Sequence, residues 1–201
     1  MIRTILEELE KCLQQIGNPI LDYLNSGLPL LDKGFIYELN KMNLEPTEEL
    51  LDLYRWRPFL SKKYIDNQNF EYNLFDMGSI IDSAQLIEKS WILNGQNPNI
   101  FRNKYVPIVL NPILSYEDPI VMDLRTESST YGGIFIYSPS ICLSDKPIQI
   151  YDSLELMILT IVECYKNGAY YITSEGMLED NSEAITNIAQ LLNKKSTFWN
   201  Y

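Results

Sequence analysis

Histidine is absent from this chain of 201 residues. Its absence excludes nucleophilic catalysis by a Ser-His-Asp triad or a Cys-His pair, and it excludes metal sites that are built on imidazole ligands. Chemistry that uses carboxylates alone remains open, because the chain carries 27 acidic residues.

Cysteine is scarce, and its spacing does not build a site. Cys12, Cys142 and Cys164 lie far apart, each in or beside an apolar stretch, so we expect buried side chains rather than disulfides. The sequence also lacks a P-loop, a dinucleotide-binding glycine fingerprint and a nucleophile elbow. We therefore predict no cofactor and no bound metal.

Long hydrophobic runs are missing as well. No stretch of about 18 apolar residues occurs, which predicts that the chain does not cross a membrane. The first residues include acidic side chains where a signal peptide would have its apolar core. These features predict a cytoplasmic protein without a membrane partner.

Positive charge is also scarce. The chain has 16 basic and 27 acidic residues, and its net charge is −11. Between Tyr105 and Asn193 only three residues are basic, whereas twelve are acidic. Such a surface repels nucleic acid and favours a basic protein partner. The same charge also serves solubility in many acidic proteins, so charge alone leaves both interpretations open.

Helices and strands are predicted in different parts of the chain. Apolar residues at intervals of three and four predict helices over 2–16, 30–42, 45–57, 83–94 and 182–194. Short β-rich runs between turn residues predict strands over 74–78, 106–111, 119–125 and 133–137. The spacing of the last three predicts an antiparallel meander. We therefore predict a single α+β domain, in which helices pack against an antiparallel sheet.

Residues 148–173 form the most complete local unit. A short apolar run is followed by a strongly apolar helix, and Asn167-Gly168 is expected to end that helix because glycine adopts the left-handed conformation easily. A second β-type run begins at Ala169. The helix is so apolar that it requires a sheet or other helices to cover it.

Two pairs of acidic residues stand one helical turn apart. Asp152 with Glu155, and Asp180 with Glu183, each match a capping box at the start of a helix. Such pairs could instead bind a metal or perform acid–base chemistry. The capping interpretation is favoured, because both pairs stand directly before an apolar helix.

Aromatic side chains gather at the end of the chain. Trp56 and Trp91 stand on predicted helices beside apolar residues, which favours packing in the core. Phe198, Trp199 and Tyr201 lie within the last four residues. These three either dock on the domain or contact a partner, and the sequence leaves both possibilities open.

Two short motifs carry a resemblance to a known family. They are Leu53-Tyr54-x-Trp56, on the helix over 44–57, and Tyr151-Asp152-Ser153-Leu154, which opens a helix. Together with the order of elements over about residues 20–170, they resemble the SUKH superfamily of Smi/Knr-type domains. Two places depart from the family pattern. Glu45 replaces a leucine, and Pro58-Phe59 stands where an Asn-Gly turn is usual.

The resemblance implies one SUKH-like domain over residues 1–201, with an N-terminal helix over 1–18 and a C-terminal extension over 169–201. It also implies a non-enzymatic bacterial immunity protein. Such proteins bind a cognate toxin of a polymorphic toxin system and neutralise it by stoichiometric contact. A basic toxin domain, for example a nuclease whose site must bind phosphates, would suit the acidic surface.

We expect the interface to use acidic and aromatic side chains at strand ends and turns. The expected partner-binding residues are Tyr116, Glu117, Asp118, Asp123 and Glu127, which could pair with arginine and lysine side chains of the toxin. Two alternatives remain. One is a SUKH-type regulatory or scaffold adaptor without a toxin, and the other is a hydrolase or ligand sensor that uses carboxylates only.

Overall fold

The computed structural model describes residues 2–17, 36–37, 45–56, 73–74, 105–110, 120–124, 126–136, 147–175 and 178–200. Its helices are α1 (Ile2–Gln15), α4 (Glu48–Trp56), α8 (Leu154–Lys166) and α9 (Ser182–Leu192), with a 3-10 turn at Phe198–Asn200. Its strands are β1 (Asn73–Leu74), β2 (Tyr105–Leu110), β3 (Ile120–Asp123), β4 (Ile134–Ile136), β5 (Ile148–Tyr151), β6 (Tyr170–Ile172) and β7 (Leu178–Asp180). Helices and antiparallel strands together confirm the predicted α+β class. The predicted helix over 83–94 lies outside the described residues.

The main sheet is an antiparallel meander. Its strands follow one another in the order β1-β2-β3-β4-β5, so each described strand pairs with its neighbour in the sequence. The register places Val121 opposite Phe135, and Phe135 opposite Gln149. For β2, β3 and β4 the meander agrees with the prediction from turn spacing, because short connections between strands favour antiparallel pairing.

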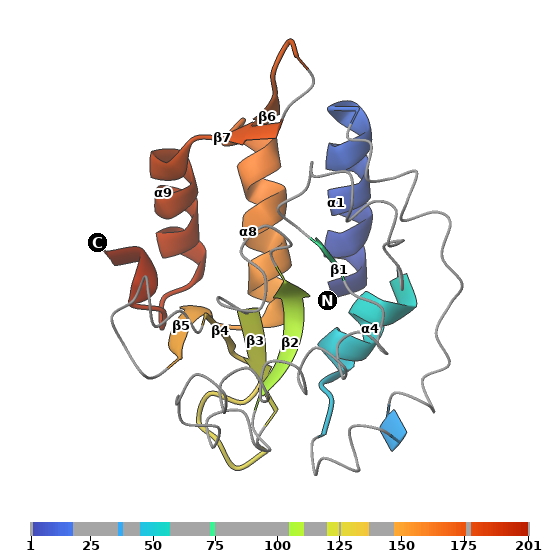
Figure 1. Cartoon of the computed structure of the whole chain (residues 1–201), viewed down its shortest axis with the longest axis vertical. Coiled ribbons are helices and arrows are strands. Elements are labelled where there is room, and N and C mark those ends of the chain that lie inside the picture. Colours follow the sequence, from blue (N-terminus) through green and yellow to red (C-terminus); the bar gives the residue numbers. More distant parts are fainter. Residues whose placement is uncertain are drawn as a thin grey trace, which may run out of the picture.

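The helices form a layer around α8. Helix α8 packs between α1 on one side and α9 on the other, and α4 contacts both α1 and α8 (Figure 1). The buried residues of α1 recur at intervals of one to four, and they are Ile2, Leu6, Leu9, Cys12 and Leu13. This stripe confirms the amphipathic helix predicted over 2–16.

One hydrophobic core joins the helices to the sheet. Leu6 of α1, Leu53 of α4, Met122 of β3 and Leu154 of α8 are all fully buried within it. Removing a leucine or methionine side chain of this size from water contributes about 1.5–3 kcal/mol. Because both layers share this core, α8 holds α1, α9 and the sheet in one arrangement.

The start of α8 differs from the predicted capping box. The N-cap is Ser153, whose Oγ accepts a hydrogen bond of 3.1 Å from the backbone N–H of Leu156. Glu49 of α4 supplies a second acceptor, because its carboxylate lies 3.3 Å from the backbone nitrogen of Glu155. Burial raises the pKa of the Glu49 carboxyl above its ordinary value. Asp152 is not the cap, because its carboxylate accepts hydrogen bonds from the C-terminal segment instead.

The second predicted capping box is also displaced by one residue. Asn181 caps α9, and its Oδ1 accepts a hydrogen bond of 3.1 Å from the backbone N–H of Ala184. Asp180 is the last residue of β7, and its Oδ1 accepts a hydrogen bond of 3.2 Å from the Ser182 hydroxyl. The expected end of α8 is confirmed, because Gly168 has a φ of 67°.

Two of the three cysteines lie in this core. Cys12 of α1 and Cys164 of α8 are buried free thiols, as predicted, whereas Cys142 lies outside the described residues. Burial raises the pKa of the Cys164 thiol to about 12 and also raises that of Cys12. Both thiols are therefore protonated at neutral pH and behave as small hydrophobic groups.

We expect the fold to lose stability in alkaline solution. A thiol whose pKa is raised by folding stabilises the fold below the pKa of the unfolded thiol, 9.0, and this contribution is lost as the pH rises towards about 12. Each such group lowers the free energy of unfolding by at most about 1.4 kcal/mol per pH unit. Urea unfolding between pH 8 and 11 should therefore show a shallower decline in Cys164→Ala than in the wild type. Identical declines would contradict the prediction.

Candidate partner-binding surface

The predicted partner-binding residues do not form one surface in the described part of the chain. Tyr116, Glu117 and Asp118 lie outside the described residues. Glu127 is exposed, and its Oε2 accepts a hydrogen bond of 3.3 Å from the Thr126 hydroxyl. Asp123, in contrast, is 0% exposed. Of the two that the structure describes, Glu127 lies on the surface and Asp123 does not.

Asp123 is a structural acceptor rather than a surface carboxylate. Its Oδ2 accepts hydrogen bonds of 2.8 Å from the hydroxyls of both Ser128 and Thr130. Its backbone N–H donates to the carbonyl of Gly133 at 3.0 Å, and its carbonyl accepts from Gly132 at 2.8 Å. Asp123 therefore does not present its carboxylate to solvent, because the carboxylate accepts hydrogen bonds inside the β3–β4 connection.

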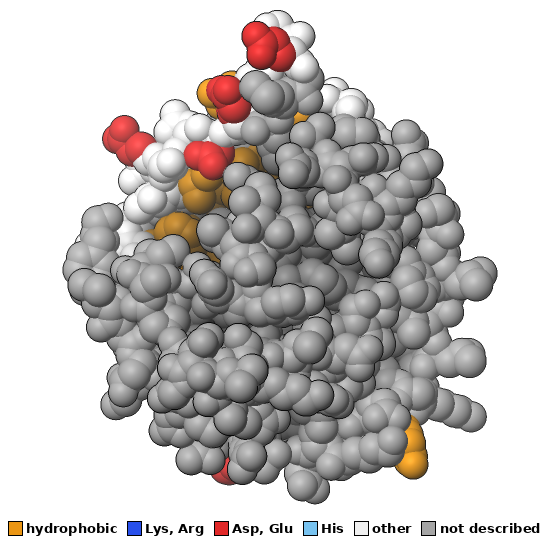
Figure 2. All heavy atoms as spheres, in the orientation of Figure 1, with side chains coloured by type: hydrophobic (Ala, Val, Ile, Leu, Met, Phe, Trp, Pro, Cys, Tyr) orange, Lys and Arg blue, Asp and Glu red, His pale blue; other side chains and the backbone are white. Residues whose placement is uncertain are grey.

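A different group of carboxylates lies on the surface. The acidic edge consists of four exposed residues on or beside β6, β7 and the start of α9, namely Glu175, Glu179, Asp180 and Glu183. Figure 2 shows acidic side chains gathered at this upper end of the molecule. No basic residue occurs between Lys166 and Lys194. The absence of basic residues over this stretch is the feature of the sequence that could have indicated an acidic surface. Which of the carboxylates are exposed to solvent follows only from the structure.

The charge of the acidic edge is not neutralised by ion pairs within the described residues. Glu179 accepts a hydrogen bond of 3.1 Å from the Tyr171 hydroxyl, which raises the pKa of Tyr171. The nearest basic residue in the sequence, Lys166, forms ion pairs with acids outside the acidic edge. Its Nζ lies 3.3 Å from Glu8 Oε1 and 3.7 Å from Glu163 Oε1. The acidic edge therefore presents negative charge to solvent.

A buried amide fixes α9 beneath the acidic edge. Asn193 is 1% exposed, and its Nδ2 donates to Thr160 Oγ1 at 3.0 Å and to the Ala189 carbonyl at 3.1 Å. Its Oδ1 accepts from the backbone N–H of Asp152 at 3.1 Å. One side chain thus connects the residue after β5, α8 and the C-terminal end of α9, and two of its three hydrogen bonds are buried while the third is partly buried.

The Asp152 carboxylate holds the segment that follows α9. It accepts hydrogen bonds from the backbone N–H groups of Lys195, at 3.1 and 3.2 Å, and of Ser196, at 3.1 Å. The Ser196 hydroxyl donates to the Gln149 carbonyl at 2.9 Å. These contacts explain why Asp152 does not cap α8, since its oxygens already bind backbone N–H groups elsewhere.

The C-terminal aromatic side chains dock on the domain. The indole N–H of Trp199 donates to the Ile150 carbonyl at 2.5 Å, and its ring centroid lies 5.6 Å from that of Tyr151. Phe198 meets Trp199 edge to face at 4.9 Å. For Phe198 and Trp199 the structure thus favours docking over a free surface, whereas Tyr201 lies outside the described residues.

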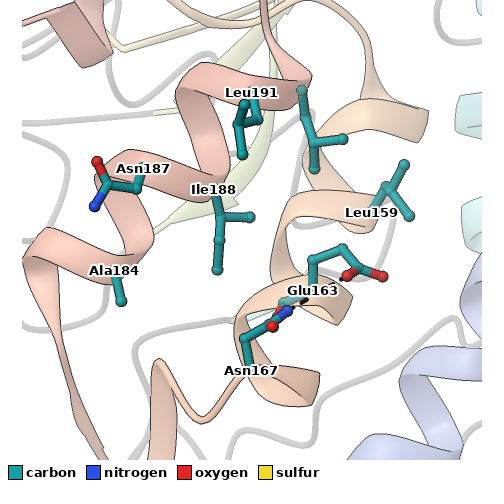
Figure 3. A pocket seen from close by; sticks show the side chains of 8 residues that line it. Leu159, Glu163, Asn167, Ala184, Asn187, Ile188 and Leu191 are labelled. Atoms are coloured by element: carbon teal, nitrogen blue, oxygen red, sulfur yellow. Dashed lines mark hydrogen bonds between the residues drawn. The ribbon is translucent and has the colours of Figure 1, made fainter.

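An apolar groove runs between α8 and α9. It has a volume of about 590 Å³ and is lined by Leu159, Glu163, Asn167, Ala184, Asn187, Ile188, Leu191 and Leu192 (Figure 3). Four apolar residues recur at helical spacing on one face of α9, namely Ile185, Ile188, Ala189 and Leu192. Only Ala189 is fully buried, and the other three are partly exposed. Helix α8 therefore covers only part of the apolar face of α9.

The described residues contain neither a cluster of metal ligands nor a membrane-spanning helix. In these ranges, no group of three or more histidine, cysteine, aspartate and glutamate side chains is placed to hold a metal ion. None of the described helices is both long enough and apolar enough to cross a bilayer.

Fold and surface together define an α+β domain with an exposed acidic edge beside an apolar groove. No protein-family model matches the chain. A search of curated proteins likewise finds no significant match.

Proposed function

We propose that this protein is a bacterial immunity protein that binds a basic toxin domain in the cytoplasm and neutralises it by stoichiometric contact. The observation that carries the proposal is the acidic edge, where four exposed carboxylates stand in a stretch without any basic residue. A basic toxin, such as a nuclease with a phosphate-binding site, offers the complementary field. Complementary fields accelerate association and favour the correct partner.

Two further features support a binding role. The motifs Leu53-Tyr54-x-Trp56 and Tyr151-Asp152-Ser153-Leu154 resemble those of the SUKH superfamily, which includes immunity proteins. In addition, Asp123 and Asp152 direct their carboxylates to hydroxyl and backbone donors within the chain. These two carboxylates therefore serve the fold, which leaves the exposed acids for a partner.

The proposal predicts that a secreted protein with a toxic C-terminal domain is encoded beside this gene, and the test is co-expression with that domain. We expect the protein to restore growth and to elute with the toxic domain as one stoichiometric complex in gel filtration. Because the attraction is electrostatic, the association rate should fall when the salt concentration rises from about 0.05 to 0.5 M. Absence of both rescue and complex would overturn the proposal and leave the adaptor interpretation.

The same assay can compare the acidic edge with the loop after β3. Charge is reversed at Glu183 in the acidic edge by Glu183→Lys, and at Glu127 in the loop by Glu127→Lys. Both residues are exposed, so Glu127→Lys should alter the free energy of unfolding by less than about 0.5 kcal/mol, and Glu183→Lys, in the first turn of α9, by about 1 kcal/mol through the helix dipole. We expect Glu183→Lys to slow association several-fold more than Glu127→Lys. The reverse order would move the interface to the predicted loop.

A further inference from the structure

We propose that the groove between α8 and α9 is the docking site for an amphipathic, basic helical segment of the toxin domain. The inference rests on the proposed function and adds the surface and the kind of segment that fills it. Figure 3 shows the side chains that line the groove between α8 and α9, and Figure 2 shows hydrophobic side chains beside acidic ones at the upper end of the molecule.

The apolar lining of the groove is left partly uncovered. Leu191 is 69% exposed, which makes it the most exposed large hydrophobic side chain among the described residues. Ile188 and Leu192 of α9 and Leu159 of α8 are only partly buried. A neighbouring helix that covered these side chains would remove apolar surface from water, which favours association.

The length of the groove defines the length of its occupant. Ala184 and Leu191 both line it and stand seven positions apart on α9. At 1.5 Å per residue, this distance is about 10 Å, or two helical turns. A helix of two to three turns with apolar residues at positions i, i+3 or i+4, and i+7 matches that length.

The two ends of the groove lie beside charges of opposite sign. Asn167 and Ala184 line the end that leads to Asp180 and Glu183 of the acidic edge. At the other end, Leu191 and Leu192 are followed by the exposed residues Lys194 and Lys195. A segment with its basic residues beside Ala184 and its apolar residues beside Leu191 meets complementary groups along its whole length. The opposite orientation would place its cations beside the two lysines.

The test is calorimetric titration of the protein with the toxic domain encoded beside its gene. Leu191→Asp should weaken binding about 30-fold or more, because a carboxylate would be buried in the apolar part of the contact. Leu191→Met should retain binding within about threefold, since methionine conserves the volume and the apolar character. Thermal unfolding checks that both variants fold, which the high exposure of Leu191 favours.

A double variant tests the direction of docking. Asp180→Asn with Glu183→Gln should weaken binding about tenfold at about 0.05 M salt and much less at about 0.5 M, because salt screens exposed charges. Ser129→Asp, on the exposed loop between β3 and β4, is the matched surface control and should bind like the wild type.

The outcomes separate the two proposals. If the wild type forms no complex, both the proposed function and the groove fail. If the wild type binds and Leu191→Asp binds equally well, only the groove fails. If Leu191→Asp instead abolishes self-association of the free protein in sedimentation experiments and leaves toxin binding intact, the groove is an interface between two copies of this chain, and the proposal is overturned.

Discussion

Asn193→Asp is expected to lower the free energy of unfolding by about 3–5 kcal/mol at pH 7, a loss typical of an uncompensated buried charge. The substitution conserves shape but replaces the Nδ2 donor with an oxygen. That oxygen would face the Ala189 carbonyl and Thr160 Oγ1, which now accept hydrogen bonds from Asn193. The Thr160 hydroxyl proton cannot compensate, because it is donated to the Leu156 carbonyl at 2.7 Å.

The pH dependence of Asn193→Asp provides a second readout. Burial among acceptors should raise the pKa of the introduced carboxyl in the folded state, so the folded state binds the proton more tightly than the unfolded state does. The deficit relative to the wild type should therefore shrink as the pH falls through that raised pKa. Chemical unfolding at pH 7 and pH 5 measures the change.

Asn187→Asp is the matched control for this prediction. Asn187 is an exposed residue of the same helix, and the substitution should change stability by less than about 0.5 kcal/mol at either pH. Equal stabilities for Asn193→Asp and Asn187→Asp would show that the buried amide does not hold α9 against α8 and β5.

Asp123→Ala is expected to cost about 2–4 kcal/mol. The change removes the acceptor of two hydroxyl hydrogen bonds, both 2.8 Å long, and hydrogen bonds to a charged group contribute about 1.5–3 kcal/mol each. The total is reduced because Ser128 and Thr130 are only partly buried and can turn towards water. Urea unfolding measures the loss.

Hydrogen exchange locates the same effect. The backbone N–H of Gly132 donates to the Asp123 carbonyl, so its protection should fall in Asp123→Ala more than protection in α8 does. Glu127→Ala is the control, since this exposed residue of the same loop should leave stability unchanged within about 0.5 kcal/mol. Comparable losses in both variants would contradict the structural role of Asp123.

The candidate surface was only partly predictable from the sequence. The position of Glu127 on a turn predicted its exposure, because turns lie at the surface. Asp123, at a strand end, was expected to be exposed for the same reason. Its side chain instead points inward, because Ser128 and Thr130 supply hydroxyl donors from within the loop. No local pattern distinguishes these two carboxylates.

The sequence by itself determined the elements whose signals are local. The apolar stripe of α1, the turn spacing of the meander and Gly168 at the end of α8 each depend on residues within a few positions of one another. Helical and strand periodicities are properties of the nearby chain, so these features were predicted with nearly the observed limits.

Only the tertiary structure decided which acceptor serves which donor. Asp152 and Ser153 can both cap α8, and the choice depends on Lys195 and Ser196, which lie more than forty positions away and claim the Asp152 carboxylate. The exposure of Leu191 likewise depends on how far α8 covers α9. Hydrogen-bond competition and the coverage of apolar faces are settled between distant segments, so neither is recorded in a local pattern of residues.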